Sequence, residues 1–370
     1  MATLPEILDF FENLFPSSLA ILDDRTGLAI KGERYQIVRI LVALELNREI
    51  FNNILRNNID FLYLHHPPLW TPLAQLSCDD PWSQMVTRLF HDGISVLAHH
   101  TNLDVCSGGI ADQWVKLLQL TGSVRPLQPR RSTFFKIITY VPPDSLESVT
   151  QALFQAGAGK LGPYGSCSFQ GDGIGTFLPL EGAQPFLGKI GHFEKTREIR
   201  VEVTLPDPGL LGFLVEAIKK NHPYQKPVID IYPLFEEFSD SEGLGRIILL
   251  DQPLHTNELI DRLQQFPEID SRSFLFFHQS SRILSKIALC PGSGGSLLET
   301  VRNEKVDAYI SGDLSHHEIE TLKLHQVDYF PIPHGAGERL ALKMIFPLIK
   351  KYGHGRFPEI VFSFEDELPQ

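Results

Sequence analysis

Short apolar segments alternate with amphipathic helical segments at both ends of this chain, and that alternation limits the folds it can adopt. Near the N-terminus, a strand-like run at 61–64 is followed by a helical pattern at 81–93 and a second strand-like run at 94–98. The same alternation resumes over 286–352. Strands that alternate with helices are typical of a largely parallel α/β sheet. We therefore expect one α/β core that both ends of the chain build together.

The middle of the chain has a different pattern. Residues 134–234 show strand, helix, strand, helix and strand in turn, with a glycine-rich stretch after the first helix. Two β-α-β units of this size predict a ferredoxin-like α+β domain of about 100 residues. We interpret 125–132 as a linker. The expected domains are the first half of the α/β core, the inserted domain and the second half of the core, at 1–130, 131–238 and 239–370.

Composition excludes several classes of protein. The chain has 370 residues, 43% of them hydrophobic and 21% charged, which is typical of a globular protein with two or three domains. The net charge of −12 argues against nucleic-acid binding, because an acidic surface repels phosphate backbones. No apolar run approaches the roughly 20 residues of a membrane span, and the N-terminus lacks a signal-peptide pattern.

Cysteine usage and the N-terminus support the same class. The four cysteines form no C-x-x-C pair, so we expect reduced thiols and a cytoplasmic protein. Near the N-terminus, Thr3 and Glu6 predict a capping box before a helix with one apolar face.

Polar side chains follow four of the predicted strands, at the point where each strand ends. In open α/β sheets, ligands bind outside the carboxyl ends of the strands, so these groups are expected at one edge and in one site. They are His65 and His66, then His99, His100 and Asp104, then Asp313, His316 and His317, and finally His334 and Glu338.

Imidazoles and carboxylates without a thiolate are the ligands of zinc, manganese and non-haem iron centres. His334 and Glu338 are four residues apart, so on a helix they share a face. Five or six such ligands are too many for one tetrahedral ion, but they fit two ions about 3.5–4 Å apart that share a carboxylate. The sequence therefore predicts a dinuclear metal site at the strand ends, with Zn, Fe or Mn as the candidate ions.

Each histidine also has an ordinary structural interpretation, because histidines at strand ends are usually hydrogen-bonded surface or core residues. The stiff Pro67-Pro68 exit favours metal ligation by the two histidines before it. We rank Asp104 above His100 as a ligand, and we expect His99 to face the core. Asp313 either lines the site or caps a helix, and the same choice applies to the histidine pair that follows it. The isolated histidines are interpreted as structural or surface residues: His91, His192, His222, His255, His278, His325 and His354.

A glycine-rich segment, PGSGGS at 291–296, lies between a predicted strand and a predicted helix. Its backbone N–H groups could hold an anion, or the segment could be a tight turn. It lacks the Lys-Ser/Thr pair of a P-loop, which argues against triphosphate binding of that kind.

Five motifs together resemble the Nif-three-like family, whose members are labelled GTP cyclohydrolase I type 2 homologues. In chain order they are LHHPPLW, AHHTNLD, PGSGGS, YISGDLSHHE and HGAGE. The resemblance implies a dinuclear centre, a toroidal homohexamer and, in longer bacterial members, an inserted PII/CutA-like ferredoxin-like domain. The segment before the last histidine, FPIP, lacks the family's D-x-G-H opening. The metal ligands that the resemblance implies are His65, His66, Asp104, His334 and Glu338, with Glu338 bridging the ions.

Two functions remain open on the sequence. The first is a metal-dependent hydrolase for a small, nucleotide-like substrate such as GTP, in which His100 or His317 moves the proton. The second is a non-catalytic metal-binding scaffold whose PII-like domain senses a ligand or binds a partner. Turnover by the purified, metal-loaded protein discriminates between them.

Overall fold

The computed structural model describes residues 2–71, 73, 75–269 and 282–368. The chain has a mixed α/β fold that divides into two compact units. The core unit comprises Met1–Arg130 and Ser239–Gln370, and the insert unit comprises Arg131–Phe238. Across the described ranges, no helix combines the length and the apolar character needed to cross a membrane.

The first half of the core unit begins with α1 and ends with α5. Its α1 starts at the predicted capping box, where the Thr3 side chain accepts a hydrogen bond from the Glu6 N–H and the Glu6 carboxylate accepts one from the Thr3 N–H. The elements are β1 (Ala2–Thr3), α1 (Leu4–Leu14), β2 (Gly27–Ile30), β3 (Gln36–Ile37), β4 (Arg39–Ala43), α2 (Arg48–Arg56), β5 (Phe61–Leu64), α3 (Pro81–His91), β6 (Ser95–Ala98), α4 (Thr101–Val105) and α5 (Ile110–Leu117).

The second half of the core unit ends in its longest helix, α11, and a short strand. The elements are α8 (Thr256–Leu263), β11 (Ile283–Ser293), α9 (Leu298–Asn303), β12 (Ala308–Gly312), α10 (His316–Leu324), β13 (Asp328–Pro331), α11 (His334–Arg356) and β14 (Val361–Phe364). Two long strands, β7 (Gly122–Val141) and β10 (Ile229–His255), run through the boundaries between the units.

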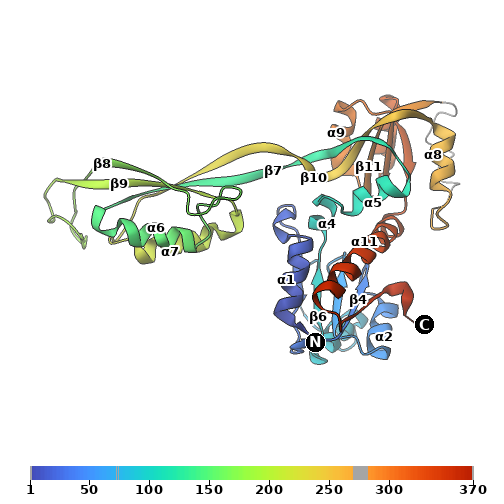
Figure 1. The fold of residues 1–370 in the computed structure, drawn as a ribbon, viewed down its shortest axis with the longest axis horizontal. Helices are drawn as coiled ribbons and strands as arrows, with labels where there is room; N and C mark the ends of the chain where they lie inside the picture. Colours follow the sequence, from blue (N-terminus) through green and yellow to red (C-terminus); the bar gives the residue numbers. More distant parts are fainter. Residues whose placement is uncertain (1, 72, 74, 270–281, 369–370) are drawn as a thin grey trace. The chain divides into compact units, whose positions relative to one another are not determined.

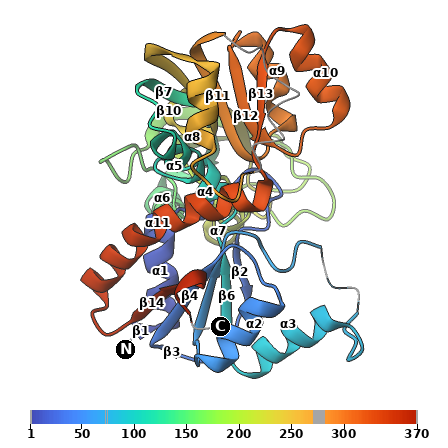
Figure 2. The same cartoon turned by 90° about the vertical axis from the view of Figure 1, so that its right-hand side faces the viewer.

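A five-stranded sheet has the order β14-β4-β5-β6-β2 (Figure 2). The first pair of histidines follows its strand β5. Its strands are parallel except for β2. Side chains alternate between its faces, as the pleat of a strand requires. Phe61 and Tyr63 pack with Phe11 of α1, whereas Leu62 and Leu64 belong to the cluster that includes α2 and α3. Both faces are therefore buried, which is typical of parallel sheets.

A second sheet contains β12 and β13, the strands that precede the other predicted site residues. Its order is β13-β12-β11-β10-β7-β9-β8, and β11, β12 and β13 are parallel. One face of β11 and β12 packs with Trp114 of α5 and Ile345 of α11, and the other packs with Val301 of α9 and Leu322 of α10. The prediction of one sheet edge is therefore wrong. Strands β5 and β6 lie in one sheet, and β12 and β13 lie in another. Each sheet buries one face in the same apolar cluster, to which α5 and α11 also contribute.

The segment that was predicted to be a linker, 125–132, lies inside the strand β7. Prolines in 125–132 favoured a loop, but a strand accepts proline where its missing N–H has no ladder partner. The helix α5 ends at Leu117, and Gln119 just beyond it adopts a φ of 50°.

The insert unit adds α6 (Leu146–Gln155), β8 (Phe169–Phe177), β9 (Glu194–Leu205) and α7 (Leu211–Asn221) between β7 and β10. The element order is therefore β-α-β-β-α-β, with β8 as an unpredicted strand in the glycine-rich stretch. The strands lie in the order β10-β7-β9-β8. Figure 1 shows α6 and α7 on the same side of these strands, where Val149 and Leu214 pack against Val201.

Deleting residues 131–238 should leave a folded core unit. The insert unit has its own apolar cluster, and the two ends of the deletion lie together: Arg130 Nη1 is 3.6 Å from Glu242 Oε2 in the neighbouring strand. A short turn can therefore join the strands. All three tryptophans, Trp70, Trp82 and Trp114, lie in the core unit, so tryptophan fluorescence during urea unfolding measures it directly. A cooperative transition close to that of the full chain is expected; loss of the transition would contradict the division.

Candidate metal centre

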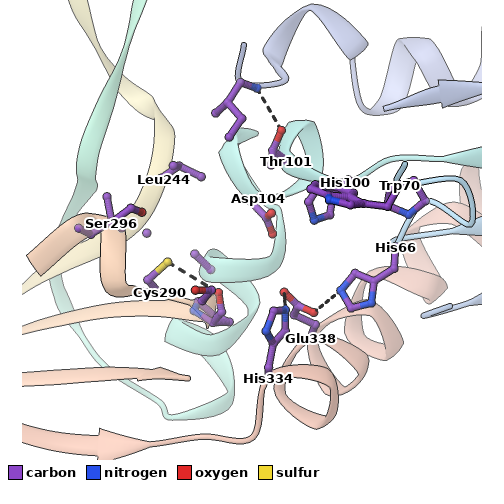
Figure 3. A pocket seen from close by; sticks show the side chains of 17 residues that line it. His66, Trp70, His100, Thr101, Asp104, Leu244, Cys290, Ser296, His334 and Glu338 are labelled. Carbon is purple, nitrogen blue, oxygen red and sulfur yellow. Dashed lines mark hydrogen bonds and ion pairs between the residues drawn. The ribbon is translucent and has the colours of Figure 1, made fainter. Parts of the chain in front are cut away.

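Five residues from both halves of the core unit converge at one place. His65 and His66 follow the last residue of β5, and Asp104 lies on α4, just beyond the end of β6. His334 begins α11, and Glu338 is one turn further along. The surrounding cavity has a volume of about 500 Å³. Figure 3 shows Glu338 between His334 and His66 in this cavity.

Glu338 is the centre of the group. Its side chain is buried, and its Oε2 is 2.7 Å from His66 Nε2. Its Oε1 is 3.1 Å from His334 Nε2 and 3.7 Å from His65 Nε2. One carboxylate therefore faces three imidazoles. The ligand atoms of His65, His66 and Glu338 lie within 4.8 Å of one another, so these three could hold a metal ion together.

Two buried atoms beside Glu338 have no hydrogen-bond partner among the described residues: His65 Nε2 and Asp104 Oδ1. They lie 3.7 Å apart. The other ring nitrogen of His65 lies 2.9 Å from the carbonyl oxygen of His99, so Nδ1 carries a proton and Nε2 is the nitrogen that can bind a cation once it is deprotonated. Two ligands about 2.1 Å from a tetrahedral ion are about 3.4 Å apart. The unpaired atoms of His65 and Asp104 therefore fit a cation.

The electrostatics of the group also favour positive charge. Burial opposes protonation of His65, but the carboxylates of Asp104 and Glu338 outweigh it and raise the pKa of His65 to about 9. The hydrogen bond to Glu338 likewise raises the pKa of His334 to about 9. Burial would raise the pKa of Glu338, yet the three imidazoles hold it below its ordinary value. Burial raises the pKa of Asp104 to about 6. Bound cations would replace these protons.

Carboxylates behind two of the imidazoles fix the orientation of their rings. Glu45 Oε2 is 3.4 Å from Nδ1 of His66, and Asp313 Oδ2 is 2.5 Å from Nδ1 of His334. Such partners hold Nε2 toward a metal. The sequence left the role of Asp313 open, and the structure makes it a support for His334. Glu45 was not predicted, because it lies in the connection after β4 with no histidine near it in sequence.

His100 lines the same cavity and has a carboxylate of its own. Its Nδ1 is 2.8 Å from Asp24 Oδ1. Burial would raise the pKa of Asp24, but hydrogen bonds from His100, Thr101 and Thr26 outweigh it and keep the carboxylate ionised. The ionised Asp24 accepts a hydrogen bond from the His100 Nδ1–H, which places the lone pair of the neutral ring on Nε2. Asp24 was not predicted, since it precedes β2 and no sequence pattern joins it to the β6 exit.

The glycine-rich segment approaches the site through Gly292. This residue has a φ of 79°, and a Cβ built on it would lie 2.4 Å from Glu338 Oε1. A side chain here would occupy the space in front of the carboxylate. Only Ser293, Ser296 and the neighbouring Cys290, Pro291 and Leu297 of this region line the cavity.

The other histidines lie elsewhere. His317, predicted to move a proton, is exposed in the first turn of α10 with His316 beside it, and neither is among the described residues that line the cavity. His317 therefore has no place in this site, because α10 starts beyond the turn that brings Asp313 to His334. His99 is buried against Phe11 and Tyr63 in the core. His278 lies outside the described residues.

Known proteins share the sequence over most of its length. The model of the family described as Duf34/NIF3 (NGG1p interacting factor 3) matches residues 2–367. A protein of Mycobacterium tuberculosis named GTP cyclohydrolase 1 type 2 homolog is 32% identical over 337 residues, which cover 90% of this chain and 88% of that protein. A protein of the same name from Bacillus subtilis is 30% identical and covers 84% of this chain and 83% of its own length.

Solved structures share the fold. Staphylococcus aureus protein SA1388 superimposes with a TM-score of 0.69 at 21% identity and covers 98% of this chain and 95% of its own. A Bacillus cereus protein related to NIF3 has a TM-score of 0.64 at 24% identity, with 98% and 96% covered. Because the family model spans nearly the whole chain and two relatives at 30% identity or more cover over four fifths of it, this protein belongs to the Duf34/NIF3 family.

Proposed function

We propose that the cavity binds two divalent ions and hydrolyses a nucleotide-like substrate. The observation that carries the proposal is the position of Glu338, whose two oxygens face different imidazoles, His66 on one side and His65 with His334 on the other. Asp104 Oδ1 supplies a further unpaired ligand atom next to His65. We assign all five as ligands, with Glu338 shared between the ions.

Two such ions, when bound, lower the pKa of a water molecule and polarise an electrophilic carbon or phosphorus. The protein supplies the proton acceptor. His100 Nδ1 faces Asp24, and no described residue is hydrogen-bonded to Nε2, so the neutral imidazole has a lone pair there that can accept a proton. Asp24 then stabilises the imidazolium, which is its role in a His-Asp pair. We assign His100 as the general base and Asp24 as the residue that orients it.

The lining of the cavity supports a substrate with an apolar ring. Trp70 stands edge-on to His100, with ring centroids 5.3 Å apart, and Ile21, Leu244 and Leu297 complete an apolar wall. The lining, all of it within the described part of the chain, contains no lysine or arginine. We therefore place the ring of the substrate against Trp70 and its reacting group toward Glu338. The label of the relatives, GTP cyclohydrolase 1 type 2 homolog, is the support for a purine nucleotide.

His100→Gln separates catalysis from metal binding. We expect the variant to keep the metal content of the unchanged protein and to lose about 10²–10⁴-fold in kcat, the usual contribution of a general base. His66→Ala should lose both metal and turnover. His91→Ala is the matched control, because that ring is exposed on α3. Metal content is measured by elemental analysis, and turnover with a panel of purine nucleotides and their nucleosides. No turnover of any of them by fully metal-loaded protein would favour the non-catalytic scaffold.

For the insert unit we propose a ferredoxin-like module of the PII/CutA type. Its β-α-β-β-α-β element order and its β10-β7-β9-β8 strand order support that assignment.

A further inference from the structure

A second cavity, of about 280 Å³, lies within the insert unit. Its lining includes three aromatic rings: Phe177 at the end of β8, Phe186 in the connection to β9, and Tyr224 after α7. The Tyr224 ring centroid is 6.3 Å from that of Phe177 and 6.3 Å from that of Phe186, and both pairs are tilted. Tyr224 thus lies next to both of the other rings, and all three give the lining of the cavity an aromatic character.

Hydrogen bonds fix this aromatic group in place. The Tyr224 N–H donates to Nδ1 of the buried His222, whose Nε2–H donates to the carbonyl oxygen of Tyr140 in β7, both at 3.0 Å. The connection that carries Phe186 is attached as well, since the Gln184 N–H donates to Gln225 Oε1 at 3.1 Å. The rings are therefore held by the sheet rather than by their own contacts alone.

A carboxylate completes the cavity. Glu198 of β9 accepts a hydrogen bond from the Tyr224 hydroxyl at Oε1, at 2.7 Å, and no described residue donates to its Oε2. The carboxylate packs over Gly175, where a Cβ would lie 2.1 Å from Oε2. Burial and the Glu198 hydrogen bond raise the pKa of Tyr224, so its hydroxyl remains a donor at neutral pH. Donation to a carboxylate also makes the phenol ring more electron-rich, which strengthens its attraction for a cation.

These features favour a compact cation over other ligands. Three aromatic rings and one carboxylate line the cavity, and this combination attracts a cation. An alkylated ammonium group fits the lining because its methyl groups contact the rings and its charge needs no hydrogen-bond acceptor. Lys226 also lines the cavity and repels any cation there, and this repulsion grows with the charge of the ligand, so a monocation is favoured over a polyamine. We propose that the insert unit binds a small organic monocation with an alkylated ammonium head group, held by the three rings and Glu198.

The test is a calorimetric titration of the full-length protein with choline, its neutral carbon isostere 3,3-dimethyl-1-butanol, and spermidine. Choline should bind at least about tenfold more tightly than the isostere, because the two differ only in charge. Spermidine should bind more weakly than choline. Glu198→Gln and Tyr224→Leu should each weaken choline binding at least about tenfold, whereas Phe213→Ala, which removes an exposed ring of α7 outside the cavity, should not.

Three results would overturn the proposal: no choline binding at millimolar concentration, equal binding of the neutral isostere, or unchanged binding in both cavity variants. Circular dichroism of each variant identifies any that fails to fold. Tyr224→Phe replaces Tyr224→Leu in that case, since it keeps the ring and removes only the hydroxyl that contacts Glu198. It should weaken choline binding less than Glu198→Gln does, and binding as tight as that of the unchanged protein would count against a role for the Tyr224–Glu198 pair.

Discussion

Glu338→Gln should weaken metal binding at both positions of the centre by more than roughly hundredfold, since changes even to residues behind the ligands cost about 10–100-fold. The Glu338 carboxylate lies among His65, His66 and His334, so no other described group is placed to neutralise two cations at once. A glutamine keeps the shape of the side chain but brings one oxygen and no charge. Two ions a few ångströms apart would then repel each other without compensation.

Asp104→Asn is the comparison that identifies the bridge. Among the described imidazoles, only that of His65 lies within 4 Å of the Asp104 carboxylate, with Nε2 at 3.7 Å from Oδ1. Neutralising Asp104 should therefore weaken the binding of one ion and leave the other unchanged. Calorimetric titration of the metal-stripped variants should therefore show two steps with one of them weakened in Asp104→Asn, and both weakened in Glu338→Gln. Loss of a single ion in Glu338→Gln, with the other bound normally, would mean that the carboxylate serves one ion only.

The chemistry of the candidate site could be predicted because it follows the ends of strands. His65 continues the alternation of Phe61 and Tyr63, so it points to the same buried side, and the proline pair after His66 keeps the chain from continuing the strand, which ends at Leu64. The i, i+4 spacing of His334 and Glu338 places both on one face at the start of α11. These are local rules of backbone geometry, and they hold whichever sheet the strand joins.

Partners that come from irregular connections could not be predicted. Asp24 reaches His100 across 76 residues, and Glu45 lies 21 residues from His66. Neither lies on a periodic segment, so no pattern marks it among the other acidic residues of the chain. His317 shows the reverse error. Its position next to a strand end resembles that of His66, but the left-handed turn at Asp313 and the capping box at Ser315 start a helix whose first residues are exposed.

The division into two sheets was also hidden from the sequence. The alternation of strands and helices predicts parallel strands, but it does not predict which strands are neighbours in a sheet. That choice depends on α5 and α11, which pack against β11 of the second sheet and share one apolar cluster with β4 and β5 of the first. The first and last strands predicted for the inserted domain lie in β7 and β10, but the full length of these strands was not predicted, because their prolines and polar residues look like loops until pairing partners are known.

Asp112→Ala should destabilise the core unit by about 3–5 kcal/mol, the usual cost of leaving a buried charge without its partner. Arg246 of β10 is 2% exposed, and its guanidinium holds the Asp112 carboxylate of α5 with two hydrogen bonds of 2.6 and 2.8 Å. The guanidinium also donates to four carbonyl oxygens, those of Cys106, Ser241, Gly243 and Gly245. These carbonyl oxygens accept hydrogen bonds from the remaining N–H groups of Arg246. They carry only a partial negative charge, so they cannot replace the carboxylate.

Urea unfolding followed by tryptophan fluorescence measures this effect in the core unit. Asp9→Ala is the matched control, because it breaks the exposed Asp9–Arg356 pair at 2.8 Å and should cost less than about 1 kcal/mol. The double variant Asp112→Leu with Arg246→Met removes both charges and fills the volume with apolar atoms. It should be more stable than Asp112→Ala, since the penalty comes from the unpaired guanidinium rather than from the lost attraction. If the double variant were instead the less stable of the two, the four carbonyl contacts of Arg246 would be the larger contribution, and the pair would act mainly by holding β10 beside α5.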